Sequence, residues 1–199
     1  MKILTIGDLH DDLSQAKKLA LIAEKEKVDL VVFNGDFTLG GIHTPGLLQV
    51  FKEKGLKLAL LPGNHESLDV IDFLKYKYAA LDLQGYGVKL GDVGIFGCGS
   101  ANIGIFQMPE DEIYSELKKG FNRIKDAKKK IMITHMHPDE TLITRVSGFS
   151  GSKGVRWALE SFQPDFLLSA HMHETEGLEE NFGPTKIISV GKAGKIIEL

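Results

Sequence analysis

Short apolar runs alternate with amphipathic segments up to about Ala80. In Leu13–Glu26 the apolar side chains recur near one face with lysines opposite, which is the period of a helix. Leu30–Phe33 is instead continuously apolar, as in a strand buried on both faces of a parallel sheet. Alternating strands and helices imply right-handed parallel crossovers. The expected elements are strand Lys2–Ile6, helix Leu13–Glu26, strand Leu30–Phe33, helix Gly46–Lys54, strand Lys57–Leu61 and helix Ser67–Tyr76, with Ser67 as its N-cap.

The pattern changes after Ala80, where shorter apolar runs are separated by glycine and Gly-Asp turns. Such punctuation favours antiparallel hairpins. A long segment with acidic residues in its first turn predicts a helix from Pro109 to about Lys128. The other expected elements are strands Leu81–Gln84, Gly87–Leu90, Val93–Gly97, Ile131–Thr134, Phe166–Ser169, Glu174–Glu180, Thr185–Val190 and Lys195–Leu199, and helix Ser152–Phe162.

Together these elements predict an α/β fold in which two mixed β-sheets pack as a sandwich flanked by helices. No repeat, linker or low-complexity tract interrupts the 199 residues, so residues 1–199 are expected to form a single domain. A chain of this length buries roughly 70% of its unfolded surface, so its stability requires neither a disulfide nor a metal.

Composition narrows the choice of partners. The chain has 24 Lys and Arg against 27 Asp and Glu, a formal charge of −3, which provides no general attraction to nucleic acid or an anionic membrane. A phosphate-bearing substrate would need a local positive site. The single cysteine, Cys98, excludes an internal disulfide, and the apolar run after Met1 is too short for a signal peptide or a membrane span. We expect a cytoplasmic protein with a small phosphate-ester partner.

The placement of histidines is the informative feature. Five of the seven follow predicted strands, and Asp8, Asp36 and Asn64 lie at the same strand ends. Ligands bind outside the carboxyl ends of strands in open α/β sheets. Each piece alone could be a polar turn, a helix cap or the shared face of alternate strand residues, but packing alone does not readily produce all of them at successive strand ends. The five histidines are His10, His65, His135, His171 and His173.

Carboxylate, amide and imidazole ligands in one place indicate divalent transition metals. Mixed nitrogen and oxygen donors suit Mn, Fe, Zn, Co or Ni better than Mg or Ca, and we expect Mn first. Two such ions about 3.5–4 Å apart repel each other, so a shared carboxylate between them is useful. The ions would lower the pKa of a bound water and orient phosphoryl oxygens.

Five short blocks, in this order, resemble the signature of the calcineurin-like metallophosphoesterase superfamily. The resemblance covers residues 7–173 and implies a two-sheet sandwich flanked by helices, which agrees with the independent prediction. The blocks are Asp8-Leu9-His10, Gly35-Asp36, Gly63-Asn64-His65-Glu66, His135 and Ala170-His171-Met172-His173.

The resemblance also implies a role for each residue. Asp36 bridges the two ions, and His65 is a catalytic histidine that is not a ligand but contacts the phosphate and protonates or stabilises the leaving oxygen. The implied ligands of one ion are Asp8, His10, Asp36 and His173. Those of the other are Asp36, Asn64, His135 and His171.

Three departures from the family pattern qualify the resemblance. Ala170 replaces the glycine that usually precedes the last histidine pair, which removes no ligand. No second aspartate follows Asp36 closely, which argues against a serine/threonine protein phosphatase and leaves the partner of His65 open. His137 stands where proline is common, and we interpret it as a histidine behind the ligands or at the surface.

Two loops have less specific interpretations. Residues 97–109 are loosely similar to the subgroup related to cyclic-nucleotide phosphodiesterases, which would place Asn102 and Phe106 near the substrate; a plain strand-to-helix loop is the alternative. The Gly/Ser-rich residues 147–154 could cradle phosphate, with Lys153 and Arg156 nearby, or form an ordinary loop.

The predicted function is hydrolysis of a phosphomonoester or phosphodiester by a metal-activated hydroxide at a binuclear centre. One alternative is a catalytically inactive metal-site scaffold of the same fold, but the chain keeps the bridging Asp36 and the Asn64-His65 pair that such proteins tend to lose. A nuclease of the same superfamily is the other alternative. Such nucleases are longer and carry DNA-binding regions, whereas this chain is short and has no basic signature.

Overall fold

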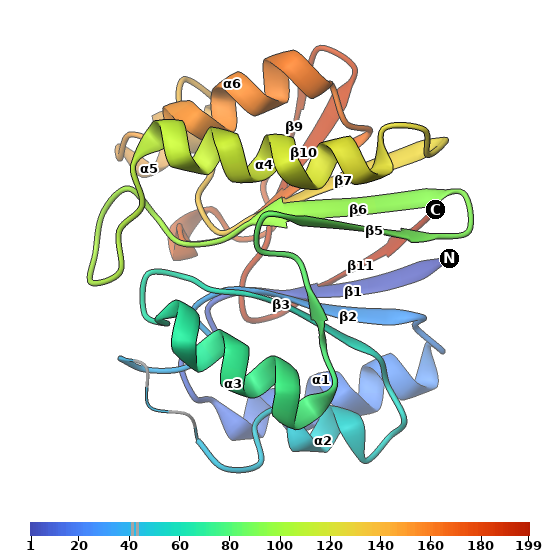
Figure 1. Cartoon of the computed structure of the whole chain (residues 1–199). Coiled ribbons are helices and arrows are strands. Elements are labelled where there is room, and N and C mark those ends of the chain that lie inside the picture. Colours follow the sequence, from blue (N-terminus) through green and yellow to red (C-terminus); the bar gives the residue numbers. More distant parts are fainter. Residues whose placement is uncertain (41, 43) are drawn as a thin grey trace.

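The computed structural model describes residues 1–40, 42 and 44–199, and it confirms a sandwich of two mixed sheets with helices on both outer faces (Figure 1). The five-stranded sheet has the order β11-β1-β2-β3-β4. Its strands are β1 (Lys2–Ile6), β2 (Leu30–Asn34), β3 (Leu58–Leu61), β4 (Leu81–Asp82) and β11 (Lys195–Glu198).

The second sheet has six strands in the order β5-β6-β7-β8-β10-β9. They are β5 (Tyr86–Leu90), β6 (Val93–Cys98), β7 (Lys129–Thr134), β8 (Phe166–Ser169), β9 (Glu179–Phe182) and β10 (Thr185–Ser189). The helices are α1 (Leu13–Lys25), α2 (Gln49–Lys52), α3 (Leu68–Tyr78), α4 (Glu110–Ile124), α5 (Leu142–Ser147) and α6 (Lys153–Phe162), with a 3₁₀ turn at His173–Thr175. None of the described helices is long and apolar enough to cross a membrane.

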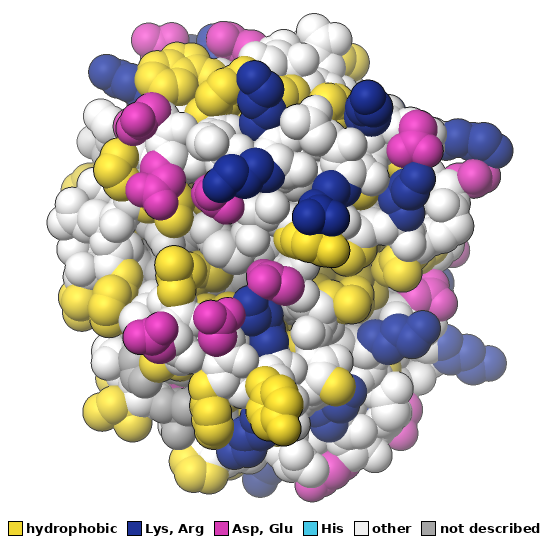
Figure 2. All heavy atoms as spheres, in the orientation of Figure 1, with side chains coloured by type: hydrophobic (Ala, Val, Ile, Leu, Met, Phe, Trp, Pro, Cys, Tyr) yellow, Lys and Arg dark blue, Asp and Glu magenta, His cyan; other side chains and the backbone are white. Residues whose placement is uncertain are grey.

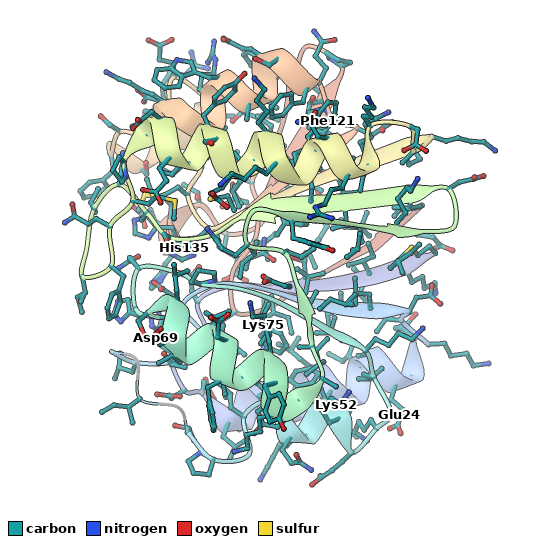
Figure 3. The ribbon with its side chains drawn as sticks, viewed as in Figure 1. Glu24, Lys52, Asp69, Lys75, Phe121 and His135 are labelled. Carbon is teal, nitrogen blue, oxygen red and sulfur yellow. The ribbon has the colours of Figure 1, made fainter. Side chains whose placement is uncertain are left out.

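Alternation along the strands builds three apolar layers. Ile3 points between the sheets, whereas Leu4 points toward α1, because successive strand residues face opposite sides. Under the helices of the other sheet, Phe121 of α4 stacks on Phe162 of α6 at 4.5 Å between ring centroids (Figure 3). Every central strand is therefore covered on both faces, as its apolar composition predicts.

Most predicted elements are confirmed, and Ser67 caps α3 by accepting a hydrogen bond from the Val70 N–H. The expectation of an antiparallel strand at Leu81–Gln84 was wrong, because β4 pairs with β3 in parallel. Ala79, in the left-handed conformation, ends α3 and returns the chain as one more β-α-β crossover. The strand expected at Glu174–Glu180 is instead a 3₁₀ turn followed by the short β9, and α5 was not predicted.

The carboxyl ends of the parallel strands of both sheets meet at one edge, where His135 lies in Figure 3. Buried Asn34 fastens the two sheets together there. Its side-chain carbonyl accepts a hydrogen bond from Thr5, and its amide donates to the Leu168 carbonyl of the other sheet at 3.1 Å. The loops that follow these strands are thus held at a fixed separation.

Candidate metal centre

The backbone turns sharply where these strands end. Asp8, His10, Asp36 and His171 all have φ between 43° and 72°, the left-handed region that non-glycine residues seldom adopt. Such strain costs of order 1–3 kcal/mol per residue and persists where the surrounding structure imposes it. Four of the seven predicted ligands therefore carry backbone strain, which is characteristic of a functional site.

The first group of candidate ligands consists of Asp8, His10 and His173. The Nε2 atoms of His10 and His173 lie 3.3 Å apart, and His173 Nε2 lies 3.6 Å from Asp8 Oδ1. The other oxygen of Asp8 accepts a hydrogen bond from the His171 backbone N–H. These side chains come from loops after β1 and β8, which belong to different sheets.

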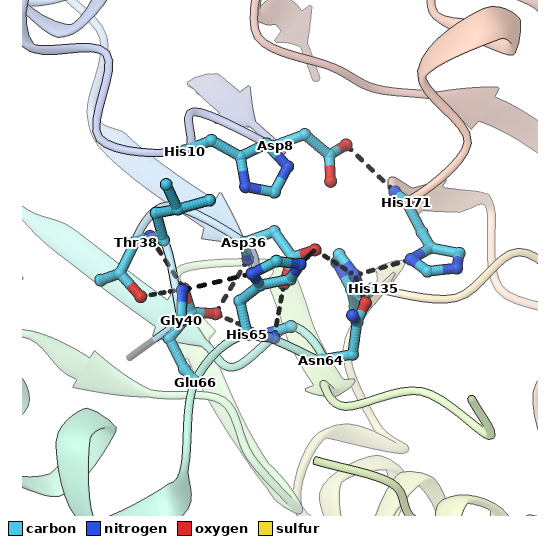
Figure 4. Close-up of polar contacts among 12 residues, drawn as sticks. Asp8, His10, Asp36, Thr38, Gly40, Asn64, His65, Glu66, His135 and His171 are labelled. Atoms are coloured by element: carbon cyan, nitrogen blue, oxygen red, sulfur yellow. Dashed lines mark hydrogen bonds and ion pairs between the residues drawn. The ribbon is translucent and has the colours of Figure 1, made fainter. Parts of the chain in front are cut away.

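The second group consists of Asp36, His135 and His171, with Asn64 beside them (Figure 4). His135 Nε2 lies 3.1 Å from His171 Nδ1, 3.1 Å from Asn64 Oδ1 and 3.4 Å from Asp36 Oδ2. His135 Nδ1 donates to the Asn34 carbonyl at 2.8 Å, which turns Nε2 toward the other three. Metal-binding histidines are commonly oriented by such a bond.

Asp36 connects the two groups. Besides its contact with His135, one of its oxygens lies within 4.8 Å of a ring nitrogen of His10 and of His65. The structure therefore brings together all seven residues predicted as ligands, and it places His65 close to them as well. Figure 4 shows Asp36 between His10 and His135.

The residues fit a pair of divalent cations. Asp8 and Asp36 are each 3% exposed, so two carboxylates are buried with little water to solvate them. Asp8 Oδ1 and His10 Nδ1 are buried, and neither has a hydrogen-bond partner among the residues that the structure describes. Two pairs of imidazole nitrogens approach to 3.1 and 3.3 Å, as nitrogens that converge on a common cation do. The mixed nitrogen and oxygen donors suit transition metals.

Charge at the second group already favours a cation. Burial lowers the pKa of His135, but the adjacent Asp36 carboxylate outweighs it and raises that pKa to about 9. Burial opposes ionisation of Asp36, yet the pKa of Asp36 is lowered by His135. Burial and the neighbouring His135 lower the pKa of His171 to about 4. A proton on His135 thus occupies the place where a metal would neutralise Asp36.

Metal binding at this group should weaken as the pH falls. Below pH 9 the ion must displace the His135 proton, while His171 is already neutral, so one proton is released. The Kd of Mn²⁺ should rise about tenfold per unit of falling pH, or roughly 100-fold from pH 8.5 to pH 6.5. Titration calorimetry in buffers of different ionisation enthalpy measures both affinity and proton release. If the Kd of Mn²⁺ stayed constant over that pH range, the predicted release of the His135 proton would be wrong.

The backbone provides the partner of His65 that sequence left open. The Gly40 N–H donates to His65 Nδ1 at 3.3 Å, so the neutral ring carries its proton on Nε2. Nε2 lies 3.9 Å from Asp36 Oδ2, and the His10 and His65 rings are 5.0 Å apart. The proton-bearing nitrogen of His65 therefore faces the candidate ligands.

Glu66 is the residue whose role sequence reasoning missed. Its buried carboxylate accepts hydrogen bonds from the backbone N–H groups of Asp36, Thr38 and Gly63 and from the Thr38 hydroxyl, at 2.7–2.9 Å. Burial, and next the charge of Asp36, raise the pKa of Glu66. One side chain thus fixes the loops after β2 and β3 relative to each other. Its place directly after His65 in the sequence block was the available signal.

Glu66→Gln should destabilise the metal-free protein by about 2–4 kcal/mol, because the amide NH₂ would face backbone donors that the second oxygen now satisfies. This corresponds to a Tm lower by roughly 5–15 °C for a domain of this size. Glu198→Gln, at an exposed position of β11, is the matched control. Equal melting temperatures for the two metal-free variants would refute the role of Glu66.

The other residues named from sequence lie around this centre. His137 is buried, with Nε2 near the Phe149 carbonyl, and does not join the groups above. Ala170 is accommodated because Gly7 has no side chain at the place where the Ala170 methyl lies.

The start of α6 already holds an anion, since the Glu110 carboxylate accepts hydrogen bonds from the Ser152 hydroxyl and the Gly154 N–H. A phosphate cradle was one of two interpretations of residues 147–154, and this pairing removes one of the N–H groups that it would use.

In the loop after β6, Asn102 and Phe106 have different surroundings. Asn102 donates to Glu110 Oε1 at 2.8 Å, which ties it to the start of α4 rather than to the candidate ligands. The Phe106 backbone N–H donates to the Asn64 carbonyl at 3.1 Å, so the backbone of Phe106 lies beside a predicted metal ligand.

Comparisons with solved structures show the same fold. The protein TT1561 of Thermus thermophilus is 16% identical, with a TM-score of 0.78, over 96% of this chain and 90% of that one. A dimetal phosphatase from Danio rerio is 11% identical with a TM-score of 0.67, over 97% and 88%. An archaeal phosphodiesterase is 19% identical with a TM-score of 0.56, over 96% and 84%. No curated protein matches the chain.

The family comparison covers nearly the whole chain. The family model described as calcineurin-like phosphoesterase matches residues 1–175, which include every candidate ligand and His65. The fold, the five sequence blocks and this match agree. The chain belongs to the calcineurin-like phosphoesterase family.

Proposed function

We propose that this chain is a binuclear metal-dependent phosphoesterase that hydrolyses a small phosphomonoester or phosphodiester in the cytoplasm, with manganese as its preferred metal. The observation that carries the proposal is the position of Asp36 between two groups of candidate ligands. When bound, two such ions activate water and neutralise the phosphoryl oxygens. In this proposal Asp8, His10, Asp36 and His173 hold one ion, and Asp36, Asn64, His135 and His171 hold the other.

Space for a substrate adjoins the first group. An open cavity of about 440 Å³ is lined by Asp8, His10 and His173 together with Lys192. This volume is in the range of small-molecule sites. Lys192 adds a positive charge to this cavity, and its ammonium would bind a phosphate oxygen.

In this proposal His65 assists the leaving group. The Gly40 N–H occupies its Nδ1, so Nε2 presents a proton toward the candidate ligands. A neighbouring ester oxygen would accept a hydrogen bond from Nε2, which stabilises the negative charge that develops there as its bond to phosphorus breaks. The phosphodiesterase and the dimetal phosphatase of the same fold support phosphate-ester chemistry, although their low identities do not fix the substrate.

A screen of three substrate classes tests the proposal. The Mn-loaded protein is assayed with p-nitrophenyl phosphate, bis-p-nitrophenyl phosphate and cyclic nucleotides. We expect hydrolysis of at least one class and its loss on chelation. No turnover with any of them, while both ions are bound, would favour the inactive scaffold.

A further inference from the structure

A groove of about 350 Å³ begins one residue after His65, between the start of α3 and the loop that follows β6. Leu68 lines it on the α3 side, and Ile105, Phe106 and Met108 line it on the loop side. The uncharged polar side chains of Ser67, Ser100 and Gln107 also line it. Among the described residues that line it, none is Lys, Arg or His, and only Glu66 and Glu112 are ionisable. A charged phosphate chain would find no partner there.

The loop that forms one wall has a defined structure. Ala101 pairs with Gln107, and the Met108 N–H donates to the Ala101 carbonyl at 2.8 Å. Gly104 has φ +98°, and a Cβ there would lie 2.5 Å from the side-chain nitrogen of Asn64. This close approach and the hydrogen bond from the Phe106 N–H to the Asn64 carbonyl pack the loop against a predicted metal ligand. The wall is therefore fixed relative to the centre.

Large apolar side chains are exposed on both walls of the groove and on the loop that contacts His65. Leu68 is 50% exposed and Ile105 66%, and Leu39 is 57% exposed on the loop whose Gly40 contacts His65. In Figure 2 apolar side chains gather along the left edge, where Figure 1 places the loop between β6 and α4. Three separate segments thus present apolar side chains beside one catalytic candidate, which costs solvation unless an apolar group covers them.

We infer that this groove binds the leaving group of the ester, and that the leaving group is an uncharged, apolar aryl or alkyl alcohol. The inference rests on the proposed function. The phosphate would lie at the metal centre near Lys192, with His65 at the ester oxygen and the organic part along Leu68, Ile105 and Phe106. The negative charge of the substrate then lies at the metal centre and Lys192, and its uncharged part lies in the groove.

Phenyl and 4-butylphenyl esters test this inference, because their phenols have almost equal pKa values and differ in apolar size. The series is made as the phosphomonoester or the diester, whichever the wild type hydrolyses. A fully buried methylene contributes about 0.8 kcal/mol, which is about fourfold, and a half-open groove about half of that energy. We expect kcat/KM to be roughly 10- to 100-fold higher for the butyl compound.

The variants Ile105→Ser and Phe106→Ser should each reduce the butyl-to-phenyl ratio of kcat/KM several-fold, because the bond from this loop to Asn64 is made by backbone. Ile22→Ser, at an exposed isoleucine toward the far end of α1, is the matched control and should leave the ratio unchanged. Equal kcat/KM for the two esters, or an unchanged ratio in both groove variants, overturns the inference while the proposed function stands. No hydrolysis of either ester by a protein that hydrolyses cyclic nucleotides overturns the inference alone. No hydrolysis of these esters or of any substrate in the screen above, with two ions bound, overturns both.

Discussion

Asp36→Asn should reduce the metal content to at most one ion per chain and lower kcat/KM by more than about 10²-fold. Asp36 belongs to the second group of candidate ligands and also lies within 4.8 Å of His10 of the first group, so its charge would serve both ions. Without that charge two cations would lie close together, and one should leave. Loss of a partner behind a metal ligand alone typically costs 10–100-fold, so loss of the bridge should cost more.

The asparagine variant keeps the shape of the site. Its side-chain oxygen can still accept the hydrogen bond that Asp36 Oδ1 accepts from the His65 N–H at 2.9 Å. Asp8→Asn is the matched control, because Asp8 belongs to the first group only and should lose less metal. Elemental analysis of both variants after loading with Mn²⁺ measures the difference. Equal occupancy in the two variants would refute the bridging role.

His65→Ala should retain both ions and the fold but lose about 10²–10⁴-fold in kcat on esters of ordinary alcohols. The side chain is bonded through Nδ1 to a backbone N–H, which leaves Nε2 to act on the substrate. The loss should be smaller for p-nitrophenyl esters, since their acidic leaving group needs little stabilisation by a hydrogen bond. Metal content, Tm and kcat on both substrate types measure the effect.

Two outcomes would contradict that role. His65 lies within 4.8 Å of His10 and Asp36, close enough to bind an ion itself. If the alanine variant loses one ion per chain, His65 is a ligand and the assignment from the family pattern is wrong. If it retains both ions and full activity on both substrates, His65 does not assist the leaving group.

Much of the fold follows from local pattern. Continuous apolar runs such as Leu30–Phe33 mark strands covered on both faces, and all five residues of β2 are indeed buried. Turn residues after Ala80 suggested hairpins, and β5 with β6 is one. The parallel pairing of β4 depends on how Ala79 ends α3, which residue type does not determine. Pattern gave the elements, whereas tertiary contacts set the pairing.

For the site too, sequence pattern predicts some features, and others depend on tertiary contacts. Ligand types at strand ends identified the side chains that the fold brings together, because parallel strands end at one edge. The function of Glu66 could not be read from spacing, since it depends on N–H groups of two separate loops meeting one carboxylate. The apolar groove likewise requires Leu68 and Ile105, which are distant in sequence, to face each other.

The most direct test of the central claim is a titration of the metal-free protein with Mn²⁺, in which bound metal and ester hydrolysis are measured in the same samples. The account predicts that activity is absent without metal and reaches its maximum when two ions are bound per chain. Full activity in the metal-free protein, or no hydrolysis of any tested ester with two ions bound, would contradict it.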